Sequence, residues 1–306
     1  MLNTCTIIIC TFLIFALPNN CFLFAANNKK TILQQQNHSN VGKLKQIILV
    51  VALLAAMRAE AQDGHFEGMA NASVMQSGLW SVNNNQAGLA DLQNFAVGVN
   101  YQNRFQLAET STKSVAAAIH TRTGNFGLSF NRFGYSQYSE NSFGLAYARQ
   151  FGDAVSAGLQ FDYLNINQSA AYGNNGVFLF EVGLIAKPIT NLQIGAHIYN
   201  PTKAKMAEYE DERVNTSFRL GASYFFSNIV QLAAEVEKTM QTDLRCKVGI
   251  EYQLISNLYL RTGFRSKPNE FCFGAGYTFK GLTFDFSFAT HQYLPMSTQI
   301  SLMYSL

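Results

Sequence analysis

The stretch EFCFGAGYTFKGLTFDFSF, from Glu270 to Phe288, alternates between apolar residues and small or polar residues. Aromatic and aliphatic residues occupy one parity, and Gly, Thr, Asp and Ser dominate the other. A strict period of two is typical of β-strands whose two faces meet different surroundings. The pair Lys280-Gly281 interrupts the period for two residues, which is typical of a tight hairpin turn. The stretch therefore predicts two antiparallel strands with one apolar face and one small or polar face.

The same alternation continues from Phe95 almost to the C-terminus and predicts about fourteen strands of roughly ten residues each. An even number of strands of this length is what a tilted, closed barrel needs to cross a bilayer. The predicted strands begin near Phe95, Val115, Gly124, Ser142, Ala154, Gly176, Leu192, Val214, Val230, Asp243, Leu258, Glu270, Gly281 and Thr298.

The connections between these strands differ in length at the two ends. Those after odd-numbered strands are often long: GYSQYSEN, NQSAAYGNN, NPTKAKMAEYEDER and THQYLPM. Those after even-numbered strands are mostly tight: TG, GD, SN (twice) and KG. Long loops at one end and short turns at the other, with both chain ends on the short side, are the layout of an outer-membrane β-barrel.

Composition predicts which face meets lipid. Hydrophobic residues make up 48% of the 306 residues, and only 13% are charged, about half the usual globular share. The apolar face is too aromatic and too continuous to fill one core, so we expect it to face lipid. A ring of fourteen strands has a wide interior, and the polar parity would then line a wet or plugged lumen. Candidate interfacial aromatic residues are Tyr101, Tyr163, Tyr252, Tyr277 and Tyr304.

The segment before the strands contains an export signal. Residues 43–61 join a basic start, an apolar run and the small-x-small sequence Ala59-Glu60-Ala61, the layout of a signal peptide for the Sec pathway. An amphipathic or buried helix is the alternative. We interpret residues 1–42 as an upstream extension created by the choice of start codon, the alternative being a long leader. Residues 1–61 carry a net charge of +4, so the remainder is near −1, which gives no argument for nucleic-acid binding.

Residues 62–92 precede the first strand and show no alternation. This segment contains Trp80 and several Met and Leu residues, which argue against a solvated tail, together with the sequence SVNNNQAGLADL from Ser81 to Leu92. Asparagine amides can satisfy many backbone and lumen groups. We therefore predict a hatch in the lumen over residues 62–92 and a transmembrane barrel over residues 93–306.

A resemblance supports this division. GMANASV, followed by LWSVNNNQAGLADL, resembles the N-terminal region of FadL-like outer-membrane barrels, and in particular the PorV/PorQ branch. Gln86 stands where that branch usually has Pro. The resemblance implies a fourteen-stranded barrel with a hatch in its lumen. The predicted hatch residues are Gly68, Met69, Asn83, Asn84, Asn85, Ala87, Gly88 and Leu89.

Charged residues fall on the inward parity of three successive predicted strands. In hairpins turning near Gln241 and Ser256, Glu237 would face Arg245, Glu235 would face Lys247, and Glu251 would face Arg261. These pairs predict either a salt-bridge ladder that orders the lumen wall or a charged constriction that selects permeants. The full set of predicted lumen charges is Glu235, Glu237, Arg245, Lys247, Glu251, Arg261 and Arg265.

The sequence contains no recognisable catalytic, cofactor or metal-binding motif. His65, His120, His197 and His291 are scattered, and no nucleophile–His–acid set can be assembled for a membrane hydrolase. Whether Cys246 and Cys272 form a disulfide stays open.

The resemblance implies a non-catalytic, secretion-associated or surface-docking component of PorV/PorQ type in a Gram-negative outer membrane. The alternative is a hatch-gated, FadL-like channel for small hydrophobic molecules. The expected partners are membrane lipid and either secretion-system proteins or a small hydrophobic ligand. We expect no nucleic-acid partner.

Overall fold

The computed structural model describes residues 64–168, 174–206, 213–227 and 229–306. The interpretations of residues 1–42 and 43–61, and the first two residues of the predicted hatch, lie outside the described residues. Within the described part, no helix combines the length and hydropathy that crossing a membrane requires.

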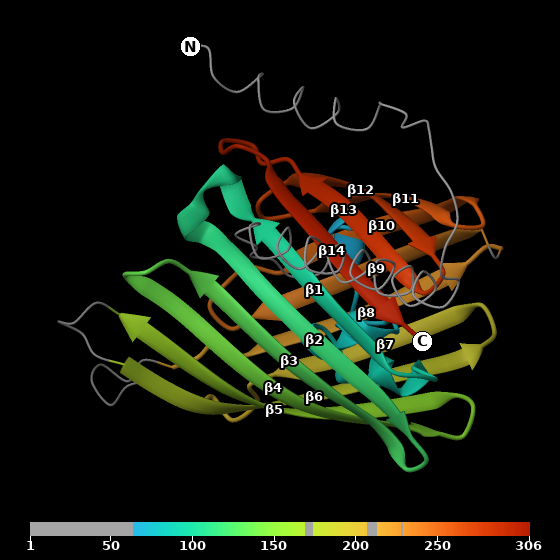
Figure 1. The fold of residues 1–306 in the computed structure, drawn as a ribbon, viewed down its shortest axis with the longest axis horizontal. Helices are drawn as coiled ribbons and strands as arrows, with labels where there is room; N and C mark the ends of the chain where they lie inside the picture. The colour runs from blue at the N-terminus through green and yellow to red at the C-terminus, as the bar shows by residue number, and fades with distance from the viewer. Residues whose placement is uncertain (1–63, 169–173, 207–212, 228) are drawn as a thin grey trace, which may run out of the picture. The chain divides into compact units, whose positions relative to one another are not determined.

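Fourteen antiparallel strands form one closed barrel in which each strand pairs with its neighbours in sequence and β14 returns to β1 (Figure 1). The predicted fold class is thereby confirmed. The strands are β1 (Ala96–Asn103), β2 (Ser111–Thr121), β3 (Gly124–Gly134), β4 (Tyr138–Phe151), β5 (Val155–Gln168), β6 (Asn174–Ile189), β7 (Leu192–Tyr199), β8 (Ser217–Phe225), β9 (Val230–Thr239), β10 (Arg245–Ile255), β11 (Leu258–Arg265), β12 (Glu270–Phe279), β13 (Leu282–Ala289) and β14 (Ser297–Ser305).

Pairing is regular around most of the ring. Among the described strands, register shifts occur only between β6 and β7 and between β10 and β11, near their tight turns. Strands β4, β5 and β6 have 14, 14 and 16 residues, longer than predicted. The predicted loop GYSQYSEN is the clearest difference, because β3 ends at Gly134 and β4 begins at Tyr138. Its polar residues alternate between the two faces like the rest of the strand. Their polar composition alone predicts a loop and does not distinguish it from the end of a strand.

The two ends of the barrel differ as predicted. Two residues separate β2 from β3, β6 from β7, β10 from β11, and β12 from β13. At the other end, residues 104–110 connect β1 to β2 and residues 290–296 connect β13 to β14. The β7–β8 connection, residues 200–216, is longer still, although its residues 207–212 lie outside the described part. The chain therefore has an end of long connections and an end of tight turns.

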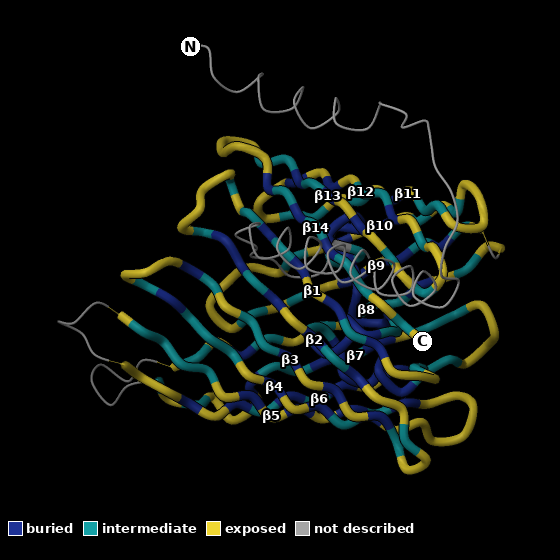
Figure 2. The backbone as a smooth tube through the Cα atoms, viewed as in Figure 1, coloured by how far each residue is buried: buried dark blue, intermediate teal, exposed yellow. Residues whose placement is uncertain are grey.

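The apolar parity points outward, which confirms the predicted orientation of the strands. Phe178 and Phe161 are 75% and 61% exposed, and similar apolar side chains are exposed on every strand, whereas the intervening residues are mostly buried (Figure 2). An apolar outer band around a closed ring is the surface of a membrane barrel, since a water-soluble protein rarely exposes a continuous apolar surface of this size.

The segment before β1 lies inside the ring, where Figure 1 shows it in blue. It contains the short helix α3 (Gly64–Glu67) and two 3₁₀ helices, η1 (Leu79–Asn83) and η2 (Gln86–Asp91). We refer to residues 64–92 as the hatch. Its apolar residues are almost fully buried and pack against inward alanines of the wall in three clusters, which contain Phe66, Leu79, Trp80, Val82 and Leu89; Met69, Val74 and Met75; and Ala70.

Candidate functional site

A belt of inward-facing glycines forms the seat of the hatch. A Cβ placed on Gly183 would lie 1.9 Å from Asn85 Oδ1, and one placed on Gly195 would lie 2.2 Å from Val74 O. Glycine is required there because hatch atoms, from the Asn85 side chain and the Val74 backbone, approach the wall more closely than a Cβ allows. The glycine belt comprises Gly98, Gly127, Gly158, Gly183, Gly195, Gly221, Gly249, Gly263 and Gly274. A glycine in a strand can equally mark tight curvature or close packing between strands, so the contacts of this belt with the hatch do not follow from the sequence alone.

The asparagines of SVNNNQAGLADL bind both the hatch and the wall. Asn85 donates through Nδ2 to Val74 O at 2.5 Å, and also to Leu184 O on β6 and Ala196 O on β7, at 3.2 and 3.3 Å. Its Oδ1 accepts the backbone N–H of Ala87. One amide thereby satisfies backbone groups from the hatch and from two strands, which is how an asparagine run stabilises a plug without regular secondary structure.

The other predicted hatch residues lie in the same plug. Asn83 Oδ1 accepts from Asn131 on β3 at 3.1 Å, and Asn84 Nδ2 donates to Trp80 O at 3.1 Å within the hatch. Gly88 is enclosed by other hatch residues. The remaining predicted residues, Gly68, Met69, Ala87 and Leu89, lie against Gly274, Gly249, Gly158 and Gly127 respectively.

Glu235 on β9 is the main charged link between the hatch and the wall. Its side chain is fully buried and accepts the backbone N–H groups of Ser73 and Val74 at 2.8 and 2.9 Å. It also forms ion pairs with Arg219 on β8 at 2.7 Å and with Lys247 on β10 at 2.8 Å. Donors from four residues therefore converge on one carboxylate, and the hatch is tied to three strands at this point.

A second charged link joins α3 to β11. Arg265 donates to both oxygens of Glu67, with Nη2–Oε1 at 2.8 Å and Nη1–Oε2 at 3.0 Å, and it also pairs with Glu270. Burial alone would raise the pKa of Glu67, but the Arg265 guanidinium outweighs it and holds the pKa of this hatch carboxyl below its usual value. The bidentate pair fixes the position of α3 as well as its charge.

The predicted registers of the charged hairpins are confirmed, although not every predicted ion pair forms. Glu237 lies opposite Arg245, Glu235 opposite Lys247, and Glu251 opposite Arg261. However, Glu237 pairs with Lys247 at 2.7 Å, while Arg245 donates to the backbone carbonyl of Lys267. Partners that the sequence reasoning missed are Arg219, Glu67, Glu270 and Asp285, of which Asp285 pairs with Arg261 at 2.5 Å.

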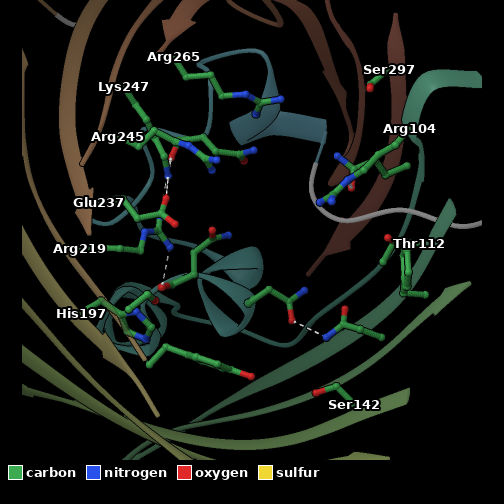
Figure 3. A pocket seen from close by; sticks show the side chains of 18 of the residues that line it. Arg104, Thr112, Ser142, His197, Arg219, Glu237, Arg245, Lys247, Arg265 and Ser297 are labelled. Carbon is green, nitrogen blue, oxygen red and sulfur yellow. Dashed lines mark hydrogen bonds and ion pairs between the residues drawn. The ribbon is translucent and has the colours of Figure 1, made fainter. Parts of the chain in front are cut away.

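A chamber of about 810 Å³ lies between the hatch and the end of long connections. Figure 3 shows Arg219, Lys247, Arg245 and Arg265 extending from one wall, with Arg104 pointing in from the other side. The lining also includes Asn83 and Asn84 of the hatch, and its other residues are mostly polar or charged, among them Gln102, Asn131, Glu140, Gln160, Asp162, Glu181, His197, Glu237, Glu270 and His291.

Strands β5 and β6 carry two of the acidic residues of this chamber, Asp162 and Glu181. Gln160 lies directly opposite Glu181 in the register and donates to Asp162 Oδ1 at 2.7 Å. Glu181 accepts from Gln86 of the hatch at 2.5 Å and lies 3.0 Å from His197 Nε2. Asp162 and Glu181 both lie on the inward parity of predicted strands, a signal that could have identified them; they were missed because no opposite charge faces them in the register.

The described residues contain no cluster of three or more His, Cys, Asp or Glu that could hold a metal ion. The open question about the cysteines is resolved, since Cys246 and Cys272 are both free thiols, the first exposed and the second buried.

No protein-family model matches the chain, and no curated protein matches it. Solved structures do match. The Ralstonia pickettii toluene transporter TbuX aligns with 81% of this chain and 99% of its own, at a TM-score of 0.65 and 10% identity. The Pseudomonas putida toluene transporter TodX aligns with 81% and 99%, at a TM-score of 0.63 and 11% identity. The fold is FadL-like. A Pseudomonas aeruginosa FadL homologue also has this FadL-like fold, with a TM-score of 0.53 and 12% identity over 80% of this chain and 99% of its own. At these identities the likeness concerns the fold.

Proposed function

We propose that the chain is an outer-membrane channel for small molecules in which the hatch controls passage. The apolar outer band and the contrast between long connections and tight turns support insertion in a Gram-negative outer membrane. The predicted signal peptide at residues 43–61 supports export through the Sec pathway. The FadL-like fold supports a transport role, because two of the similar structures are described as toluene transporters.

The observation that carries this proposal is a chamber whose floor is the hatch. The chamber has a volume of about 810 Å³, and the hatch beneath it packs against small inward residues around the ring. A molecule leaving the chamber toward the tight-turn end must therefore displace part of the hatch. A hydrophobic passenger remains a prediction based on the fold. Because the chamber lining is mostly polar, we propose a passenger that carries at least one polar group.

A non-conducting docking component of PorV/PorQ type is the second candidate. A hatch held by two charged links and by the glycine belt supports it, since a scaffold needs a sealed lumen. Its partner surface would include the loop NPTKAKMAEYEDER, residues 200–213. Recovery of the barrel without a partner protein, from membranes solubilised in mild detergent, would count against this candidate.

A single cysteine substitution tests whether passage needs hatch movement. Ala70 of the hatch packs in a buried cluster with the free thiol of Cys272 on β12. In a Cys246→Ser background, Ala70→Cys should form a disulfide under oxidising conditions and lock the hatch to the wall. We expect the flux of small solutes into liposomes to fall on oxidation and to recover on reduction. The matched control, which also carries Cys272→Ser, cannot form the bond and should not respond.

The outcomes separate the two candidates. Equal flux in the locked and reduced barrels would refute gating by the hatch. An absence of flux from every reduced barrel would refute the channel and favour the docking component.

A further inference from the structure

Around Asp162 and Glu181, which line the chamber from β5 and β6, three buried oxygen atoms have no hydrogen-bond donor. They are Asp162 Oδ2, Gln160 Oε1 and Gln86 Oε1, and their residues are 3%, 3% and 0% exposed. The orientation of both amide groups is set by the hydrogen bonds that their nitrogen atoms donate, from Gln160 to Asp162 and from Gln86 to Glu181. Buried acceptors in folded proteins normally have a partner. The three acceptors together match a group that donates several hydrogen bonds.

The charges at the same place are also unbalanced. Asp162 lies within hydrogen-bonding reach of Glu181, and among the described residues neither carboxylate forms an ion pair with a Lys or Arg. The Arg219 guanidinium, which lines the same chamber, is held by Glu235, to which it donates through Nε and Nη2 at 2.7 and 3.1 Å. Two adjacent buried carboxylates repel each other unless a cation or a shared proton lies between them.

We propose that Asp162, Glu181, Gln160 and the hatch residue Gln86 bind the primary ammonium group of a small molecule held in the chamber. An ammonium group carries one positive charge and three donors, which matches three unpaired acceptors beside two carboxylates. A calcium ion would need six to eight oxygen ligands, whereas here the amide nitrogens of Gln86 and Gln160 and the His197 ring already occupy carboxylate oxygens.

The position of the site gives it a role. Gln86 belongs to the hatch, and its donor atom lies 2.5 Å from Glu181 Oε2. Because the hatch residue Gln86 supplies one of the acceptors for the ammonium, ligand binding and hatch docking are coupled there. The proposal of the binding site depends only on the geometry. The statement that its ligand is the molecule transported through the barrel rests on the proposed channel function.

Calorimetric titration of the complete barrel with its hatch, in detergent at neutral pH, tests the site. The probe is butylammonium, with butanol as the uncharged analogue and Ca²⁺ as the metal. We expect butylammonium to bind, and Asp162→Asn and Glu181→Gln each to weaken binding by about tenfold to a hundredfold, the usual range for a hydrogen bond to a charged group. Gln160→Met removes an acceptor without changing the charge and should also weaken binding. Glu140→Gln, elsewhere in the same chamber, is the matched control and should leave binding unchanged.

Each variant is first checked for a folded barrel by its heat-modifiable migration on a gel. Absence of butylammonium binding, equal binding of butanol, binding of Ca²⁺ in its place, or unchanged affinity in folded Asp162→Asn and Glu181→Gln would each overturn the proposal. Liposome flux is measured separately. Flux without binding refutes the ammonium site alone, and binding without flux refutes the channel alone.

Discussion

Replacing Glu235 by Gln should release the hatch. The carboxylate accepts from the backbone of Ser73 and Val74 at 2.8 and 2.9 Å and neutralises Arg219 and Lys247 at 2.7 and 2.8 Å. A glutamine keeps the shape but loses the charge, and its NH₂ group would point at donors. Removing one partner of a buried ion pair costs about 3–5 kcal/mol. We assign most of this cost to the docked state of the hatch, because Ser73 and Val74 belong to the hatch and both Arg219 and Lys247 also donate to hatch residues.

Amide hydrogen exchange measures this effect directly. At about 1.4 kcal/mol per factor of ten, protection of the Ser73 and Val74 amides should fall by roughly a hundredfold to several thousandfold. Glu251→Gln is the matched control, because its partner Arg261 keeps the Asp285 carboxylate at 2.5 Å. Protection that falls less than about tenfold, or falls equally in both variants, would refute the role given to Glu235.

Three further predictions concern the hatch, the belt and the outer band. The folded pKa of Glu67 lies below its unfolded value, so its contribution to hatch docking is complete above about pH 5 and is lost as the pH falls through the folded pKa. Protease cleavage of the hatch should therefore rise in acid, and Glu67→Gln should remove this part of the rise. An unchanged acid response in Glu67→Gln would contradict the assignment. Gly183→Ala should destabilise the barrel by about 1–3 kcal/mol through its clash with Asn85, and denaturant unfolding should show no such loss when Asn85→Ala is already present. Phe161→Arg on the outer band should cost about 2–4 kcal/mol near the bilayer midplane, whereas Tyr293→Arg in a connection should be nearly neutral in unfolding from vesicles; equal effects would contradict the orientation of the strands.

The barrel was predictable because alternation is a local signal. Several predicted strand starts, including Gly124, Leu192, Val230, Leu258 and Glu270, coincide with the observed ones. Burial on one face fixes the register of neighbouring strands, so the opposed pairs of the charged hairpins also followed from the sequence. Strand length was less predictable, because polar residues at the start of β4 can belong to a strand or to a loop.

The seat of the hatch was not predictable to the same degree. A glycine in a strand can mark curvature, a bulge or a close approach, and the sequence does not say which. Contacts such as that between Ser73 and Glu235 join residues 162 positions apart, and no local pattern encodes them. The asparagine run did indicate a plug, but which strands it would touch depended on the path of the hatch through the ring.

The junction between β1 and β14 bears on how this molecule is made. It pairs Ala96 with Ser305, and the backbone N–H of Leu306 donates to Phe95 O at 3.1 Å. These partners lie farther apart in sequence than those of any other strand pair, so pairing β1 with β14 has the largest entropic cost of loop closure. This strand pair should therefore form last. The hatch is continuous with β1, so during biogenesis the remaining strands can close around it. The hatch then helps to shape the barrel that later encloses it.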